Sequence, residues 1–183
     1  MQIKEKYDRL LYYTWYIGSF EVSRIQTDPG FTLSIMLCKV MHHLGIPTHQ
    51  LSTTQIIIYG INANGTCPIG KIKFKCQICD LKFEVTCYVI DADTSYNLLL
   101  GRSWIHGNPI VPSTFHQVTK YADEGGEVRM LIVEKHPFKG VDNYFTDSLL
   151  YQDSLETVED PSQEDPDSSN VVDTEPEPEE KCL

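Results

Sequence analysis

Asp28, which is followed directly by Pro29 and Gly30, has the clearest potential for catalysis in this sequence. A carboxylate held in a defined position can act as a general acid or a general base. Asp, Pro and Gly are also the commonest turn residues, so the tripeptide alone indicates only a tight turn. What Asp28 can do therefore depends on the elements that hold it.

Cysteines and histidines raise the possibility of metal binding. Cys76 and Cys79 have the spacing of a zinc knuckle, but a structural zinc site needs four ligands, typically from two such pairs, and the sequence has no second pair. We interpret these cysteines as small buried hydrophobic residues. His42, His43 and His49 surround the end of an expected helix, where a cation suits the helix dipole. We therefore expect no metal site and no cofactor, and a zinc-binding adaptor is the least supported of three functional hypotheses.

Short apolar segments separated by turn residues indicate an all-β fold with one or two small helices. Apolar residues at helical spacing end at Leu44, and Gly45 is a typical helix stop. Asn64 and Gly65 provide a hairpin turn. The expected strands are Ile56–Tyr59, Lys71–Cys76, Phe83–Ile90, Phe115–Tyr121 and Val128–Val133.

The negative charge of the chain is concentrated at its C-terminal end. Residues 1–146 carry a balance of +1 and residues 147–183 a balance of −12, which together give −11. The near-neutral body has no basic stripe and gives no support for nucleic-acid binding. The tail has too few apolar residues to offset the entropy of ordering, so we expect it to be disordered.

No segment of the sequence suggests a membrane. The apolar run at residues 10–17 is shorter than the roughly 20 residues that a spanning helix needs. No secretory cleavage pattern follows it. We therefore expect an intracellular, cytoplasmic protein without a signal peptide, whose cysteines are free thiols.

Composition divides the chain into four regions: an aromatic lead-in (residues 1–24), a β-rich domain (25–134), an aromatic connector (135–151) and the acidic tail (152–183). The lead-in is expected to form an outer strand or dimer contact, or to cap the core. The connector either docks back on the domain or is a remnant of a longer polyprotein.

Three stretches, taken in order, resemble the aspartic protease domain of plant gypsy-type (LTR) retrotransposon polyproteins, a retropepsin-like domain, over residues 20–134. The first comprises Asp28-Pro29-Gly30 and Leu44-Gly45-Ile46-Pro47, and the second runs from Phe83 to Asn97. The third and most specific comprises Tyr96–His106 and Val111–Gln117.

The resemblance implies a half-size acid-protease fold, that is, a closed β-barrel with one or two short helices. Residues 31–36 would continue as a strand, and the helix would be confined to about residues 37–44. Enzymes of this class hydrolyse peptide bonds with two carboxylates that share one proton. Because this domain supplies only Asp28, the resemblance implies a two-fold homodimer in which each subunit contributes one carboxylate.

Roles for further residues follow from the same resemblance. Gly30 would let the backbone approach the carboxylate closely. Leu99, Leu100 and Gly101 would support the Asp28 loop, with Arg102–His106 as a short helix after them. The hairpin Gln55–Ile69 would be a flap that closes over substrate, with Asn62, Asn64 and Gly65 at its tip.

Three residues depart from the pattern of active enzymes, which usually carry Asp-Thr-Gly or Asp-Ser-Gly. Pro29 has neither the hydroxyl nor an N–H group. Phe31 replaces a small residue and would narrow the cleft, and Gln26 replaces an apolar residue. Two hypotheses follow: an aspartic endopeptidase whose polypeptide substrate is the element's own polyprotein, or a catalytically inactive dimerisation and binding module with the retropepsin fold.

Overall fold

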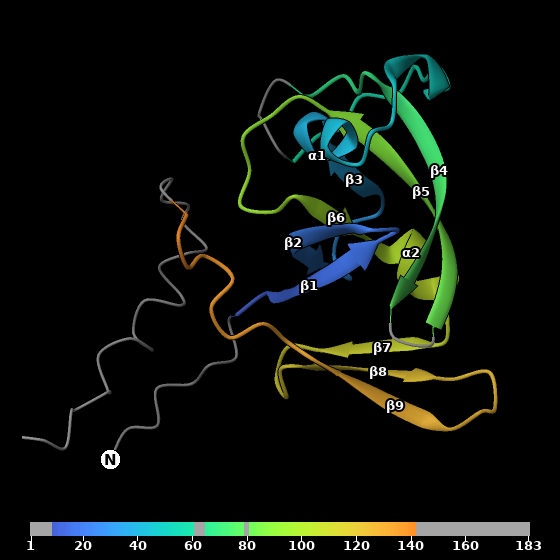
Figure 1. Ribbon diagram of the computed structural model, residues 1–183, viewed down its shortest axis with the longest axis vertical. Coiled ribbons are helices and arrows are strands. Elements are labelled where there is room, and N and C mark those ends of the chain that lie inside the picture. Colours follow the sequence, from blue (N-terminus) through green and yellow to red (C-terminus); the bar gives the residue numbers. More distant parts are fainter. Residues whose placement is uncertain (1–8, 61–64, 79–80, 142–183) are drawn as a thin grey trace, which may run out of the picture.

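A computed structural model describes residues 9–60, 65–78 and 81–141 of the chain (Figure 1). The strands are β1 (Leu11–Ile17), β2 (Phe20–Thr27), β3 (Ser34–Leu37), β4 (Gly70–Ile78), β5 (Leu81–Ile90), β6 (Leu98–Leu100), β7 (Ile110–Ser113), β8 (Val118–Ala122) and β9 (Val128–Ile132). The helices are α1 (Cys38–His43), the 3-10 helix η2 (Thr48–Gln50) and α2 (Arg102–His106). The predicted all-β class with two short α-helices is confirmed.

Six strands form a mixed sheet in the order β1-β2-β6-β3-β5-β4. The short strand β6 is parallel to β2 on one side and antiparallel to β3 on the other. The sheet curls into half a barrel, and its two edge strands, β1 and β4, come into contact. β6 lies in the middle of the sheet. The last three residues of β2 pair with one side of it, and Ile35 and Met36 of β3 pair with the other.

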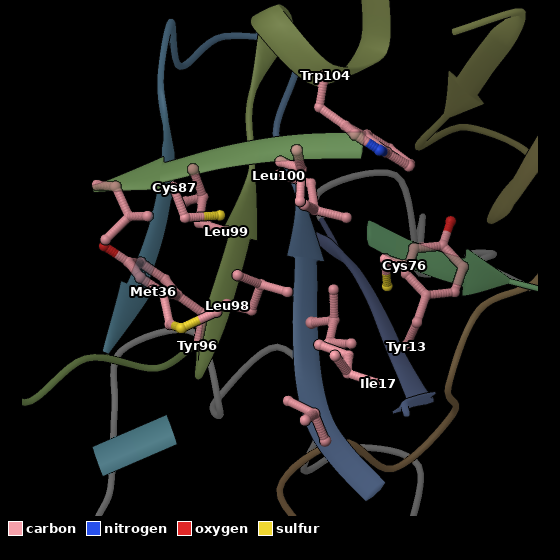
Figure 2. Packing of buried hydrophobic residues seen from close by; sticks show 14 of the residues in the cluster. Tyr13, Ile17, Met36, Cys76, Cys87, Tyr96, Leu98, Leu99, Leu100 and Trp104 are labelled. Carbon is pink, nitrogen blue, oxygen red and sulfur yellow. The ribbon is translucent and has the colours of Figure 1, made fainter. Parts of the chain in front are cut away.

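The longest hairpin, β4–β5, follows from strict alternation of side chains. Leu81, Phe83, Val85 and Cys87 are buried, and the residues between them face solvent. This pattern gives one face to the core and one to water. Figure 2 shows the core that results, with Leu98, Leu99 and Leu100 of β6 among the buried side chains.

The strand predicted over residues 31–36 begins later than expected, at Ser34. Phe31 and Thr32 lie outside it because their carbonyl oxygens accept hydrogen bonds from the backbone N–H groups of Arg102 (2.7 Å) and Ser103 (3.2 Å). Helix α1 spans Cys38–His43, inside the expected range, and Gly45 behind it has φ of +69°. A long-range contact, which the local pattern does not reveal, therefore makes the strand begin at Ser34 and not at residue 31.

The prediction of a strand at Ile56–Tyr59 is wrong. Among the described residues from 53 to 69, the one β-bridge joins Ile58 to Thr66, through two backbone hydrogen bonds of 2.9 and 2.8 Å. Pro68 lies two residues beyond Thr66 and has no N–H group with which to extend the ladder. Ile57 and Tyr59 are exposed, so an apolar run here does not mean burial.

The aromatic lead-in contains an edge strand that also contributes to the core. β1 pairs with β2 in the main sheet, and its residues Leu11, Tyr12 and Tyr13 are almost fully buried. The described part of the connector lies on the same strand. The Glu134 N–H group donates to Tyr12 O, and the Phe138 ring meets the Tyr12 ring edge-on at 5.3 Å. Residues 142–183, which include the rest of the connector and the acidic tail, lie outside the described residues.

A second sheet of three antiparallel strands, in the order β7-β8-β9, follows α2. The predicted hairpin of β8 and β9 is confirmed. Strand β7 is absent from the sequence prediction because Pro112 interrupts its four residues, Ile110–Ser113. It lies at the edge of its sheet, where a proline is tolerated. Among the described residues, no helix is long and apolar enough to cross a membrane.

Tyr13 joins the two sheets, because its hydroxyl group hydrogen-bonds to the buried Thr119 hydroxyl of β8. Tyr13→Phe leaves Thr119 buried without this partner, so we expect the free energy of unfolding to fall by about 1–3 kcal/mol. Urea unfolding measures the change. Tyr16→Phe is the matched control: the Tyr16 hydroxyl bonds Glu21 at the surface, and its removal should cost less than about 0.5 kcal/mol. Equal losses in the two variants would contradict the assignment.

Candidate active site

Asp28 follows the last residue of β2 and is half-buried. Its backbone N–H group donates to the carbonyl oxygen of Leu100 (3.1 Å), which continues the parallel pairing of β2 with β6. The main chain at Asp28 is therefore fixed by a strand from the other end of the domain. A side chain that leaves a strand end in this way can point into solvent while its backbone remains held.

The Asp28 loop is closed by its own carboxylate. The Gly30 N–H group donates to Asp28 Oδ1 at 2.8 Å, and the Phe31 N–H group donates to the Asp28 carbonyl at 3.3 Å. A Cβ atom on Gly30 would lie 3.1 Å from Oδ1, closer than such atoms normally approach. A side chain at position 30 would therefore crowd the Asp28 carboxylate.

Gly101 lies directly against the chain that follows the Asp28 loop. A Cβ atom at this position would be 2.1 Å from the carbonyl oxygen of Leu33 and 2.7 Å from that of Phe31. The Gly101 N–H group donates to the Ser34 hydroxyl at 3.2 Å. With Leu99 and Leu100 buried beside it, Gly101 brings the segment after Asp28 into contact with the end of β6.

Two residues that support the loop are not among the predicted site residues. Thr32 accepts a hydrogen bond from Arg102 Nη2 at 2.7 Å, and Ser34 is fully buried. The sequence does hint at Ser34, because it is a lone hydroxyl within the apolar run Leu33–Leu37 and a buried hydroxyl needs a partner. Nothing in the local sequence distinguishes Thr32 from an ordinary loop residue.

The three departures from the family pattern occupy different positions in the site. Pro29 is exposed. Phe31 is half-buried, and its ring lies 3.6 Å from where a Cβ atom of Gly60 would stand. Gln26 is buried behind the loop, where its Oε1 atom accepts a hydrogen bond from the Tyr12 hydroxyl at 3.3 Å. Gln26 thus satisfies its polar side chain within the core, and Phe31 is the departure that reaches the chain expected to form the flap.

Of the three predicted residues at the flap tip, Asn62 and Asn64 lie outside the described residues. Gly65 has φ of +76°, and a side chain there would come within 2.6 Å of Ile57 Cγ2. The bridge between Ile58 and Thr66 joins the two arms.

A neutral phenol lies within electrostatic reach of the Asp28 carboxylate. Burial raises the pKa of Tyr96 to about 12, a hydrogen bond with Thr94 partly opposes the rise, and the charge of Asp28 adds to it. The Thr94 hydroxyl also donates to the Tyr96 carbonyl oxygen at 2.7 Å. Tyr96 therefore remains uncharged at physiological pH and adds no second negative charge beside Asp28.

The cysteines of the β4–β5 hairpin have the character of buried hydrophobic residues. Burial raises the pKa of the Cys76 thiol to about 11 and raises that of Cys87 further. Cys79 lies outside the described residues. Within the described part of the chain, no group of three or more His, Cys, Asp or Glu side chains could hold a metal ion.

Taken together, these contacts hold one carboxylate in a fixed loop at the surface of the domain. Such a group can accept or donate a proton, or orient a water molecule. Peptide hydrolysis by carboxylates requires two of them a few ångströms apart. The Asp28 loop supplies one.

Comparison with known proteins gives structural similarity only. No protein-family model and no curated protein matches the chain. The retroviral protease-like domain of Ddi1 from Leishmania major is 18% identical, with a TM-score of 0.49, over 67% of this chain and 90% of that one. A retropepsin-like aspartic protease from Rickettsia conorii is 16% identical, with a TM-score of 0.44, over 57% and 76%. Neither similarity assigns a role to a residue of this chain.

Proposed function

We propose that this chain is an aspartic endopeptidase domain of retrotransposon origin that acts as a homodimer, with Asp28 of each subunit supplying one of two catalytic carboxylates. The observation that carries the proposal is the Asp28 loop. It places a half-buried carboxylate at a strand end and fixes it to Leu100 through a backbone hydrogen bond. The Gly30 N–H group also donates to the carboxylate, so the loop holds the side chain as well as the backbone of Asp28.

The need for a second carboxylate supports the dimer. One Asp28 acts as base toward a water molecule while the other protonates the peptide carbonyl. The two carboxylates can hold a single proton because two adjacent negative charges are costly. A two-fold axis beside Asp28 provides the second group without any further catalytic residue in the chain.

The proposed substrate is a polypeptide cut between largely apolar residues. The chain before the flap tip exposes Ile57 and Tyr59, with 49% and 66% of their surfaces accessible. Apolar side chains of a bound peptide would cover them. The resemblance to retrotransposon proteases suggests that the natural substrate is the polyprotein of the retrotransposon itself.

The test is cleavage of an unstructured protein by the purified full chain at mildly acid pH, with the oligomeric state measured in the same sample. We expect a dimer whose activity is stopped by pepstatin-type inhibitors. No cleavage by a protein that is demonstrably dimeric would refute the enzyme and leave the non-catalytic binding module.

Restoring the usual residues beside Asp28 should increase the cleavage rate. In Pro29→Thr/Phe31→Ser, the threonine hydroxyl can hydrogen-bond across the dimer, and loss of the phenyl ring widens the cleft. We expect a gain of at least about tenfold in kcat/KM, which corresponds to about 1.4 kcal/mol of transition-state stabilisation. Pro109→Thr/Phe115→Ser, at two exposed positions, is the matched control. An unchanged rate in the first variant would show that Pro29 and Phe31 do not limit catalysis.

A further inference from the structure

The three residues of β6 do not fix their own register in the sheet. All three are leucines, and all three are buried (Figure 2). Register is strongly specified where apolar and polar side chains alternate, because a slip of one residue then turns the wrong side chains toward the core. A slip of β6 by one residue would still place leucine at two of its three positions. The register of β6, which determines where Asp28 is held, is therefore set at the ends of the strand.

At its C-terminal end, β6 is aligned with the chain that follows Asp28. Gly101 provides this alignment, because a Cβ atom there would overlap the backbone of Leu33. The strand that precedes Asp28 is a different matter. β2 pairs with β6 over three residues, Ile25–Thr27, before the Asp28 N–H group donates to Leu100 O. The alignment of β2 with β6 therefore depends on the contacts at the other end of β6.

The other end of β6 lies beside a bulge in β2. The register of β1 with β2 shifts between Tyr13 and Trp15, where Ser23 and Arg24 of β2 lie opposite Thr14 alone. Arg24 has φ of +53°, which is uncommon for a residue with a side chain. A bulge disrupts the ladder and leaves main-chain groups to be satisfied elsewhere. Contacts from outside the β1–β2 pair are needed to complete this one.

Asn97, the residue directly before β6, provides these contacts. Its backbone N–H group donates to the Arg24 carbonyl oxygen at 3.0 Å, and its side-chain Nδ2 atom donates to the Ser23 carbonyl oxygen at 2.9 Å. Arg24 Nη2 in turn donates to Asn97 Oδ1 at 3.3 Å. The Asn97 carbonyl oxygen accepts a hydrogen bond from the N–H group of Leu37, the last residue of β3, at 3.2 Å. Asn97 thus binds both strands that flank β6.

We propose that Asn97 is a positioning residue for Asp28: it holds the β2 bulge in register with β6 and so sets where the Asp28 carboxylate stands. The inference rests on the proposed function, because the position of Asp28 affects catalysis only if Asp28 is catalytic. An amide group does not titrate, so Asn97 acts through the alignment of β2 and not by exchanging a proton. Its side chain is the decisive part, since it bonds the Ser23 carbonyl and the Arg24 guanidinium at once.

Hydrogen exchange tests the alignment without any proteolysis. The Asp28 N–H group reports the pairing of β2 with β6, since it donates to Leu100 O at 3.1 Å. The Ala122 N–H group donates to Pro109 O at the same distance beside the second sheet, so it reports general loosening of the domain. We would follow both amide groups by NMR in the full chain, because exchange measures how often each hydrogen bond opens.

Asn97→Ala is the test variant, and Asn108→Ala is the matched control. Asn108 is also half-buried, and its amide likewise donates to a main-chain carbonyl oxygen, that of Trp104, at 2.7 Å. If Asn97→Ala does not fold, Asn97→Asp takes its place under the same criteria. The carboxylate has the size of the amide and can still accept from Arg24, but it loses the donation to Ser23 O.

We expect the Asp28 amide to exchange at least about tenfold faster in Asn97→Ala, with Ala122 changed by less than about twofold. The control should leave both amides within about twofold of the unsubstituted chain. Unchanged exchange at Asp28 would overturn the proposal. Equal acceleration at Asp28 and Ala122 would also overturn it, since Asn97 would then contribute only to general stability.

Cleavage by the same proteins tests the consequence for catalysis. We expect kcat of Asn97→Ala to fall at least about tenfold with KM within about twofold, because a misplacement of about 1 Å at a reacting group can cost about a hundredfold in rate. Asn108→Ala should keep both constants. An unchanged kcat in Asn97→Ala would overturn the positioning role. If the unsubstituted chain does not cleave, the proposed function fails, and hydrogen exchange still decides whether Asn97 sets the register.

Discussion

Asp28→Asn will abolish cleavage and leave the domain folded. The asparagine Oδ1 atom can still accept the hydrogen bond from the Gly30 N–H group, so the loop keeps its closing contact. The amide group cannot exchange a proton with water or substrate. In a homodimer the substitution removes both carboxylates, and we expect kcat/KM to fall by at least about a thousandfold.

Glu124→Gln, on the exposed turn between β8 and β9, is the control for loss of one carboxylate elsewhere. Thermal unfolding of the unsubstituted protein, Asp28→Asn and Glu124→Gln should show similar midpoints. If Asp28→Asn cleaves as fast as the unsubstituted protein, another group or a contaminant performs the reaction.

Mixing the two proteins tests whether the carboxylates are shared between subunits. If each active unit needs Asp28 from both, an equal amount of Asp28→Asn should lower the activity of a fixed amount of the unsubstituted protein to roughly half, because mixed dimers are inactive. A subunit that is active by itself would retain its full activity after mixing.

Gly101→Ala will have the largest effect on stability. Its Cβ atom would stand 2.1 Å from the carbonyl oxygen of Leu33 and 2.8 Å from the carbonyl carbon of the same residue. Both are backbone atoms, so no side-chain rotation relieves the overlap. We expect the free energy of unfolding to fall by at least about 3 kcal/mol, which is large for one methyl group.

Urea unfolding of Gly101→Ala, compared with Gly125→Ala, measures this loss. Gly125 lies in an exposed turn, where the nearest atom to an added Cβ is a side-chain oxygen of Asp123 at 3.3 Å. We expect the control to change stability by less than about 1 kcal/mol. A loss of that size in Gly101→Ala would mean that β6 and the Asp28 loop move apart more easily than their hydrogen bonds suggest.

The sequence predicts the elements whose burial follows a simple period. β4 and β5 alternate cleanly, and both predicted strands are present. The predicted β8–β9 hairpin is also present, although β8 begins at Val118 and not at Phe115. Ile56–Tyr59 has the composition of a strand but only one pairing residue, because strand formation depends on a partner that composition does not report. β7 has only four residues and Pro112 interrupts them, so it is not recognised from its own residues.

The candidate site is predictable only through the resemblance. Periodicity and turn propensity place Asp28 in a loop and leave its function open. The contacts that distinguish the loop come from Leu100, Gly101 and Arg102, and a local pattern cannot reveal a hydrogen bond to a distant segment. Ser34 is the exception, since an isolated hydroxyl in an apolar run requires a partner.

The contacts that hold the Asp28 loop also determine when a newly made chain can acquire it. Arg102 and Thr32 are 70 residues apart in sequence, and Gly101 and Ser34 are 67 apart. A ribosome adds about 5–20 residues per second, so for several seconds the emerging chain contains Asp28 without β6 or α2. Under the proposed function, a chain that has not yet been extended past Ser103 has no assembled site. Proteolysis would then begin only after this part of two chains has been synthesised and the two domains have met.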